Sequence, residues 1–201
     1  YVPERAEACQ QYLRKAGLAP AAIYSGENGY KELCARPDID LVYVATDWEH
    51  HFPVAEEALK HGKNVADEVP SAMNLEECWK LVNLSEKMQK NCMILENCCY
   101  DWFEMRTLNM AQHGVFGEII RAQGAYIHNL DDFWDYYWKN PNGSDPEQLG
   151  WRLKYNRENR GDVYATHGLG PVAQALDIHR GDRMKTLVAM DTKSVHSKEL
   201  V

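Results

Sequence analysis

A run of apolar and β-branched residues at positions 39–46 is the feature that most constrains the fold. It reads Ile-Asp-Leu-Val-Tyr-Val-Ala-Thr, which is typical of a parallel strand buried on both faces. A helical stripe follows over Pro53–His61, and Gly62 supplies its stop signal. We therefore expect a central strand followed by a crossover helix.

The alternation continues along the chain. Residues 64–66 are expected to form a short strand, and residues 92–95 the next strand. Between them, Asn74 and Glu77 have the spacing of a capping box, which predicts a helix to about Lys90. Three strands joined by two helices predict an α/β fold with a Rossmann-like, doubly wound parallel sheet.

The pattern changes after Asn97. A helix rich in Met and aromatic residues is expected to about His113, and Glu118–His128 alternates like a longer strand. Residues 131–160 show no clear period, which suggests long loops over a binding face. We predict two domains, 1–99 and 100–201, each of them partial. A helical pattern that begins with the first residues and ends near Gly17, and the absence of an initial Met, suggest a start in mid-domain, so exported and cytoplasmic locations both stay open.

Charge and cysteine spacing exclude several classes of partner. The formal net charge is -8, and Lys and Arg form no cluster that could bind a phosphate backbone, so nucleic acid is not expected. No apolar run approaches the roughly 20 residues of a membrane span. The six cysteines have no zinc spacing, and His50-His51 lacks a third ligand. We expect reduced thiols and no metal.

Polar residues end each predicted strand. Because ligands bind beyond the carboxyl ends of parallel strands, Thr46, Glu68 and Asn97 are expected to line one crevice, with Trp48 and His51 near the first turn. The alternative is that polar residues simply end strands. The Gly-x-Gly-x-x-Gly turn and its acidic partner do not occur here. We expect them before Tyr1, although a sheet that never bound a nucleotide would look the same.

Several strings resemble glycoside hydrolase family 109, within the glucose-fructose oxidoreductase and inositol dehydrogenase superfamily. Most of that superfamily has Glu-Lys-Pro where this chain has Glu68-Val69-Pro70. The chain departs from the family at Asp47 and Ala165, where Pro is usual, and lacks the Trp usual near His50. The strings that carry the resemblance are Trp48-Glu49, Glu68-Val69-Pro70, Glu96-Asn97-Cys98-Cys99-Tyr100-Asp101, Ala125-Tyr126-Ile127-His128 and the segment 161–171.

The resemblance implies an NAD-dependent enzyme that cleaves N-acetylgalactosaminides. It also implies that the second domain is an α+β domain with an open, mostly antiparallel sheet, through which a homo-oligomer could form. In this family the sugar C3 hydroxyl is oxidised transiently, the C1 substituent is eliminated, water adds, and C3 is reduced again. An ordinary glycosidase instead uses two carboxylic acids.

The resemblance also assigns roles to residues of the second domain. It makes His167 and Tyr164 the groups beside the reacting hydroxyl, Tyr126 the candidate for the C2 proton, and Arg152 and His128 substrate-binding residues. A Tyr with an ordinary pKa of about 10 is a poor base, so Tyr126 needs a positive neighbour or the cofactor ring. A His that follows a Thr often only caps or packs, which is the alternative for His167.

Other features of the sequence allow more than one interpretation. The aromatic residues at positions 134, 136, 137 and 138 could stack on a sugar ring or anchor their loop on the core. Adjacent Asp131 and Asp132 point to opposite faces of an extended segment, so we expect them to be solvated. The rival functions are a sugar dehydrogenase of the same superfamily and a non-catalytic sugar or nucleotide sensor.

Overall fold

The computed structural model describes residues 3–129 and 150–193. The chain divides into two compact units, Tyr1–Glu96 and Asn97–Val201. Within the described residues, no helix is long and apolar enough to cross a membrane. The aromatic residues at positions 134–138 and the Asp131-Asp132 pair lie outside the described residues.

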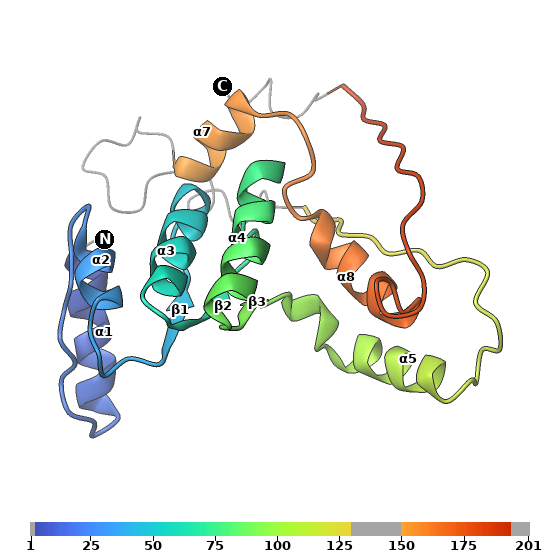
Figure 1. Ribbon diagram of the computed structural model, residues 1–201. Helices are drawn as coiled ribbons and strands as arrows, with labels where there is room; N and C mark the ends of the chain where they lie inside the picture. The colour runs from blue at the N-terminus through green and yellow to red at the C-terminus, as the bar shows by residue number, and fades with distance from the viewer. Residues whose placement is uncertain (1–2, 130–149, 194–201) are drawn as a thin grey trace. The chain divides into compact units, whose positions relative to one another are not determined.

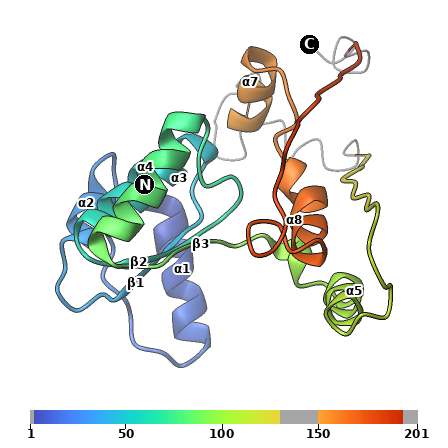
Figure 2. The same ribbon diagram turned by 45° about the vertical axis from the view of Figure 1, so that its right-hand side comes forward.

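The first unit contains a three-stranded parallel sheet, as the sequence predicts (Figure 1). The strands lie in the order β1-β2-β3, and the register pairs Val44 of β1 with Asp67 of β2. Figure 2 shows α3 and α4 on the same side of the strands. The elements are α1 (Pro3–Lys15), α2 (Gly29–Cys34), β1 (Leu41–Val44), α3 (Trp48–Lys60), β2 (Asn64–Asp67), α4 (Leu75–Met88) and β3 (Cys92–Ile94).

The core of the first unit lies between the sheet and helix α3. Val44 and Val65 are 1% exposed, and Ala55, Ala58 and Leu59 are fully buried. The stripe of apolar residues predicted on this helix is therefore its buried face. Burying these side chains is the main favourable contribution to folding of the unit.

Two predictions about β1 are wrong. In the sheet that the described residues form, the strand lies at the edge rather than in the centre, and it is buried on one face only. Leu41 and Tyr43 are 56% and 59% exposed, whereas the alternate residues Val42 and Val44 are buried. The reason is that α3 and α4 cover one face, and nothing in residues 3–129 and 150–193 buries these two side chains on the other.

The capping box before α4 is confirmed. Asn74 adopts an extended conformation, and its side chain accepts a hydrogen bond from the Glu77 backbone N–H at 2.9 Å. The Glu77 carboxylate in turn accepts from the Met73 backbone N–H at 2.8 Å. These contacts satisfy two backbone donors at the point where the chain enters the helix.

Helix α3 begins at Trp48, earlier than the predicted start at Pro53. Asp47 is its N-cap residue, and its carboxylate lies 2.6 Å from the His50 imidazole in the first turn. Pro53 is thus inside the helix. Trp48, His50 and His51 all belong to the first turn of this helix.

In the described part of the second unit, the regular secondary structure is helical. It contains the 3₁₀ turn η1 (Asn97–Cys99), α5 (Trp102–Gln112), α7 (Trp151–Glu158) and α8 (Ala165–Ala175). Helix α8 packs on η1 and α5. The predicted helix to about His113 is thus confirmed as α5.

Two predictions for the second unit are wrong. The predicted strand over Glu118–His128 is irregular, since no strand lies beside it among the described residues of this unit to form a ladder. The loop predicted over 131–160 contains helix α7 in its described part. Leu153 is buried, and the Arg, Leu, Lys and Glu residues of α7 are good helix formers.

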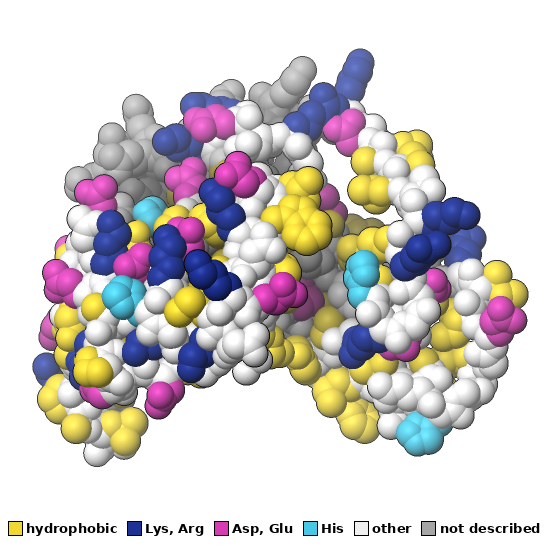
Figure 3. Space-filling view, in the orientation of Figure 1, with side chains coloured by type: hydrophobic (Ala, Val, Ile, Leu, Met, Phe, Trp, Pro, Cys, Tyr) yellow, Lys and Arg dark blue, Asp and Glu magenta, His cyan; other side chains and the backbone are white. Residues whose placement is uncertain are grey.

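Charged side chains of both signs are mixed on the face of the first unit that Figure 3 shows. Lys60 pairs with Glu56, and Lys80 pairs with Glu76, at 2.9 and 2.7 Å. Such exposed pairs contribute little to stability. They do reduce the positive potential that isolated lysines would create.

We expect the cysteines of the first unit to differ in reactivity. Burial, with a smaller contribution from Glu57, raises the pKa of Cys34 to about 11. Burial, with a smaller contribution from Asp67, raises the pKa of Cys92 to about 11. Since the thiolate is the nucleophile, iodoacetamide at pH 8 should modify exposed Cys9 and Cys78 well before Cys34 and Cys92. Peptide mass spectrometry over time checks this order, and equal rates would contradict it.

Candidate functional site

The carboxyl ends of β1 and β2 bring Thr46 and Glu68 to the same edge of the sheet. This follows from the register, because Val44 and Asp67 are partners and each strand ends there. Thr46 is exposed, and its hydroxyl donates to the Asp47 carbonyl at 3.1 Å. Glu68 is half-buried, and its carboxylate accepts from the Tyr43 hydroxyl at 2.5 Å. This hydrogen bond raises the pKa of Tyr43.

The other predicted cofactor residues lie in different environments. Trp48 is 3% exposed and His51 is 2% exposed, both in the first turn of α3. Asn97 opens η1 in the second unit and is exposed. The predicted cofactor contacts of these residues stay predictions.

Asp67 is a buried carboxyl that the sequence reading did not single out. It is fully buried, and burial raises its pKa to about 7, with Ser71 opposing the rise and Glu68 adding to it. Its Oδ1 lies 3.7 Å from Nδ1 of His51. An Asp in a short strand otherwise rich in apolar residues was the signal available in the sequence.

Four aromatic and imidazole rings gather in the second unit. The Tyr126 ring centroid lies 4.6 Å from that of His167, 4.4 Å from that of His128 and 5.3 Å from that of Tyr164. Tyr164 and His167 stack, with centroids 5.0 Å apart and planes inclined by 12°. Four of the five residues predicted for this domain therefore lie together.

Helix α8 sets the spacing of Tyr164 and His167. Tyr164 is its N-cap residue, and its carbonyl accepts from the His167 backbone N–H at 3.0 Å. The Asp162 carboxylate accepts from the Tyr164 backbone N–H at 2.9 Å. Because three residues span about one helical turn, the two rings lie on the same side of the helix and stack.

Two further residues of the second unit have different neighbours. Cys98 on η1 has its sulfur within 4.8 Å of a ring nitrogen of His167, a neighbour that spacing alone did not predict. Arg152, predicted to hold substrate, lies on α7 with its guanidinium 4.2 Å from the Trp151 ring. That stacking is a cation–π contact.

A close backbone approach brings Tyr126 to helix α8. A Cβ atom added at Gly124 would lie 2.1 Å from the carbonyl oxygen of Gly168. A Cβ at Gly168 would in turn lie 3.0 Å from the backbone nitrogen of Ala125. Only glycine at position 124 permits this approach, and Tyr126 follows two residues later.

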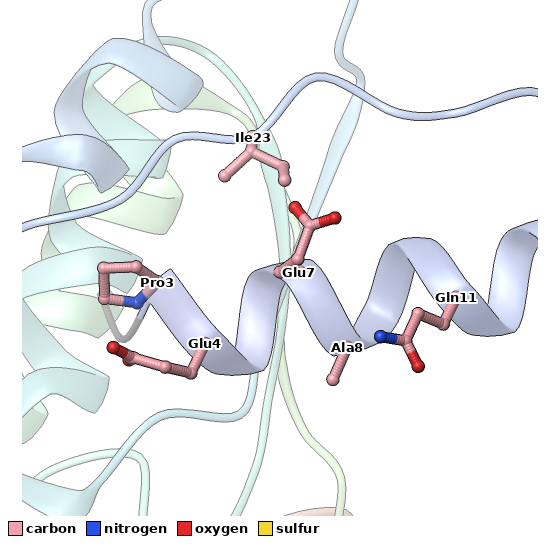
Figure 4. A pocket seen from close by; sticks show the side chains of 6 residues that line it. All are labelled: Pro3, Glu4, Glu7, Ala8, Gln11 and Ile23. Carbon is pink, nitrogen blue, oxygen red and sulfur yellow. The ribbon is translucent and has the colours of Figure 1, made fainter.

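A separate hollow of 520 Å³ lies along α1 (Figure 4). It is lined by Pro3, Glu4, Glu7, Ala8, Gln11 and Ile23. Its two carboxylates and lack of a basic group make it unsuited to phosphate. None of the predicted site residues contributes to it.

Comparison with known proteins defines the class of each part. Residues 3–96 match the family model described as "Oxidoreductase family, NAD-binding Rossmann fold". A probable dehydrogenase from Thermotoga maritima has the same fold, with a TM-score of 0.50 and 21% identity over 58% of this chain and 33% of its own. The chain therefore carries a nucleotide-binding domain of the oxidoreductase type.

The second unit identifies the family. Residues 100–201 match "Glycosyl hydrolase 109, C-terminal domain". The chain is 74% identical over 201 residues to Glycosyl hydrolase family 109 protein 4 of Phocaeicola vulgatus, and 61% identical over 196 residues to protein 1 of Bacteroides thetaiotaomicron. It covers 38% and 40% of these relatives, and they cover 100% and 97% of the chain. The chain belongs to glycosyl hydrolase family 109.

We expect Gly124→Ala to disturb the ring cluster. The new methyl group collides with backbone, which cannot move as a flexible side chain can, so the free energy of unfolding should fall by about 1–3 kcal/mol. Gly181→Ala is the matched control, since its Cβ would meet only the Asp177 side chain. Urea denaturation of the full-length proteins measures both, and equal losses would argue against the close approach.

Proposed function

We propose that this chain is part of an NAD-dependent glycosidase that cleaves N-acetylgalactosaminides. The observation that carries the proposal is the ring cluster of Tyr126, His128, Tyr164 and His167, in a unit that matches the family 109 C-terminal domain. The chain spans less than half of the relatives it matches. The activity is therefore proposed for the whole protein.

The described residues of the first unit fit the polar end of a nicotinamide cofactor. The exposed Thr46 hydroxyl and the half-buried Glu68 carboxylate lie at the carboxyl edge of the parallel sheet. These groups suit the amide and ribose hydroxyls of such a cofactor. When bound, NAD would supply reversible oxidation of the sugar at C3.

The second unit supplies the groups for proton transfer. His167, with Tyr164 stacked against it, would accept the proton of the C3 hydroxyl. Tyr126 would remove the C2 proton once C3 is a ketone. Its ring lies beside two imidazoles, and a protonated imidazole at that distance favours the phenolate.

Substrate positioning falls to other residues. Arg152 and His128 would hold the sugar. The C1 substituent leaves as the C2 proton is removed, and water then adds a hydroxyl to C1 and a proton to C2. The C3 ketone finally regains two electrons and two protons, which completes the cycle. No external oxidant is consumed. Val69 is buried and has no proton to transfer, which argues against the dehydrogenase chemistry that a Lys at this position would assist.

The full-length protein should release nitrophenol from a nitrophenyl N-acetylgalactosaminide without accumulating reduced cofactor. Mass spectrometry should find NAD that survives purification, and solvent deuterium should appear at C2 of the product. Steady growth of reduced-nicotinamide absorbance would contradict the proposal and indicate a sugar dehydrogenase.

We expect His167→Gln and Tyr164→Phe to lower kcat by about 100-fold to 10,000-fold, the usual contribution of a general acid or base. His113→Gln is the matched control, because this exposed His contacts the Asn109 carbonyl at the end of α5. If His167→Gln and Tyr164→Phe retain full activity, the ring cluster is not catalytic. A non-catalytic sensor would instead show no turnover in the wild-type protein, and both variants would keep its ligand binding.

A further inference from the structure

A buried imidazole joins the segments that follow β1 and β2. His51 is 2% exposed, and its Nδ1 lies 2.7 Å from the Pro70 carbonyl oxygen. Its Nε2 lies 3.1 Å from the Thr46 carbonyl oxygen. A carbonyl oxygen only accepts hydrogen bonds, so both ring nitrogens face acceptors.

A neutral imidazole cannot satisfy both contacts. It carries one N–H, and its other nitrogen presents a lone pair. In either tautomer that lone pair would face a carbonyl oxygen across 2.7 or 3.1 Å. The imidazolium has an N–H on each nitrogen and fits both oxygens.

A positive charge at this depth requires a nearby negative one. Asp67 at the end of β2 is fully buried, with Oδ1 3.7 Å from His51 Nδ1. Neither of its oxygens accepts a hydrogen bond of normal geometry from the described residues. A lone buried carboxylate is costly, which is why burial raises the pKa of Asp67 to about 7, and an imidazolium beside it offsets much of that cost.

We infer that His51 is an imidazolium that positions the Thr46 and Pro70 segments, with Asp67 as its buried counter-ion. The two contacts of the His51 imidazole connect the segments that follow the carboxyl ends of two neighbouring strands. One of these segments carries Thr46 itself, and the other carries Glu68. His51 thus holds in place the part of the sheet edge where cofactor contacts are predicted.

Other ionisable groups around the pair come from three elements. The charge of Glu68 raises the pKa of Asp67, and the charge of Asp67 raises the pKa of the Cys92 thiol on β3. In the first turn of α3, His50 is paired with Asp47. Neutral His51 with protonated Asp67 holds the same number of protons, so pH dependence of stability cannot separate the two states, and the location of the proton must be observed directly.

Nuclear magnetic resonance of the full-length protein with 15N-labelled histidine locates the proton. The His51 signal is assigned by its loss in His51→Gln and by its response to Asp67→Asn. At pH 7 both His51 ring nitrogens should carry a proton. A spectrum in which only one His51 nitrogen carries a proton overturns the inference. The protonation state is measured on the wild-type protein, so the test stands even if a variant fails to fold.

Asp67→Asn tests the counter-ion. Removing the carboxylate should make His51 lose its second proton at pH 7, whereas Asp40→Asn, a change at an exposed Asp, should leave both protons in place. A doubly protonated His51 in Asp67→Asn would overturn the role of Asp67.

The effect on cofactor rests on the proposed function. His51→Gln should raise the Kd for NAD by about tenfold, equivalent to roughly 1.4 kcal/mol, and His61→Gln at the exposed end of α3 should leave it unchanged. An unchanged Kd in His51→Gln overturns the positioning role. If the wild-type protein does not bind NAD, the proposed function fails, while the wild-type spectrum still decides the protonation of His51.

Discussion

The parallel pairing of β1 with β2, held by helix α3, is the constraint on which the rest of the first unit depends. Val44 and Val65 pack against Ala55, Ala58 and Leu59, and this packing fixes the register. Once Val44 lies opposite Asp67, both strands end at the same level. The polar residues after them then share an edge because of hydrophobic burial elsewhere, not because they attract one another.

In the second unit, a close contact between two backbone segments brings the site residues together. Its ring cluster depends on residues that are about 40 positions apart in the chain, Tyr126 on one side and Tyr164 and His167 on the other. The approach of Gly124 to Gly168 brings these segments together. Glycine matters here because it has no Cβ, whereas the aromatic rings supply most of the contact area.

The sequence predicted the periodic elements better than their surroundings. The strands at 41–44, 64–67 and 92–94, and the helix capped by Asn74, follow from local patterns. The exposure of Leu41 and Tyr43 does not, because burial depends on what covers the strand. The segment 118–128 alternates like a strand, but an alternating pattern becomes a strand only where a partner completes the hydrogen bonds.

In the candidate site too, some residues could be predicted from the sequence, and others gain their role only from neighbours in the fold. Resemblance to the family selected Tyr126, His128, Tyr164 and His167, and the structure brings them together. Asp67 directly follows the predicted strand at 64–66, where a polar residue at the end of a strand looks ordinary. Its meaning depends on His51, sixteen residues earlier in the chain. A buried acid next to a buried base is costly for each residue alone and favourable only for the pair. Asp67 stands at the end of β2, where an apolar residue would also fit. Its role is best explained by the two carbonyl groups that the His51 imidazole contacts, one at Thr46 and one at Pro70.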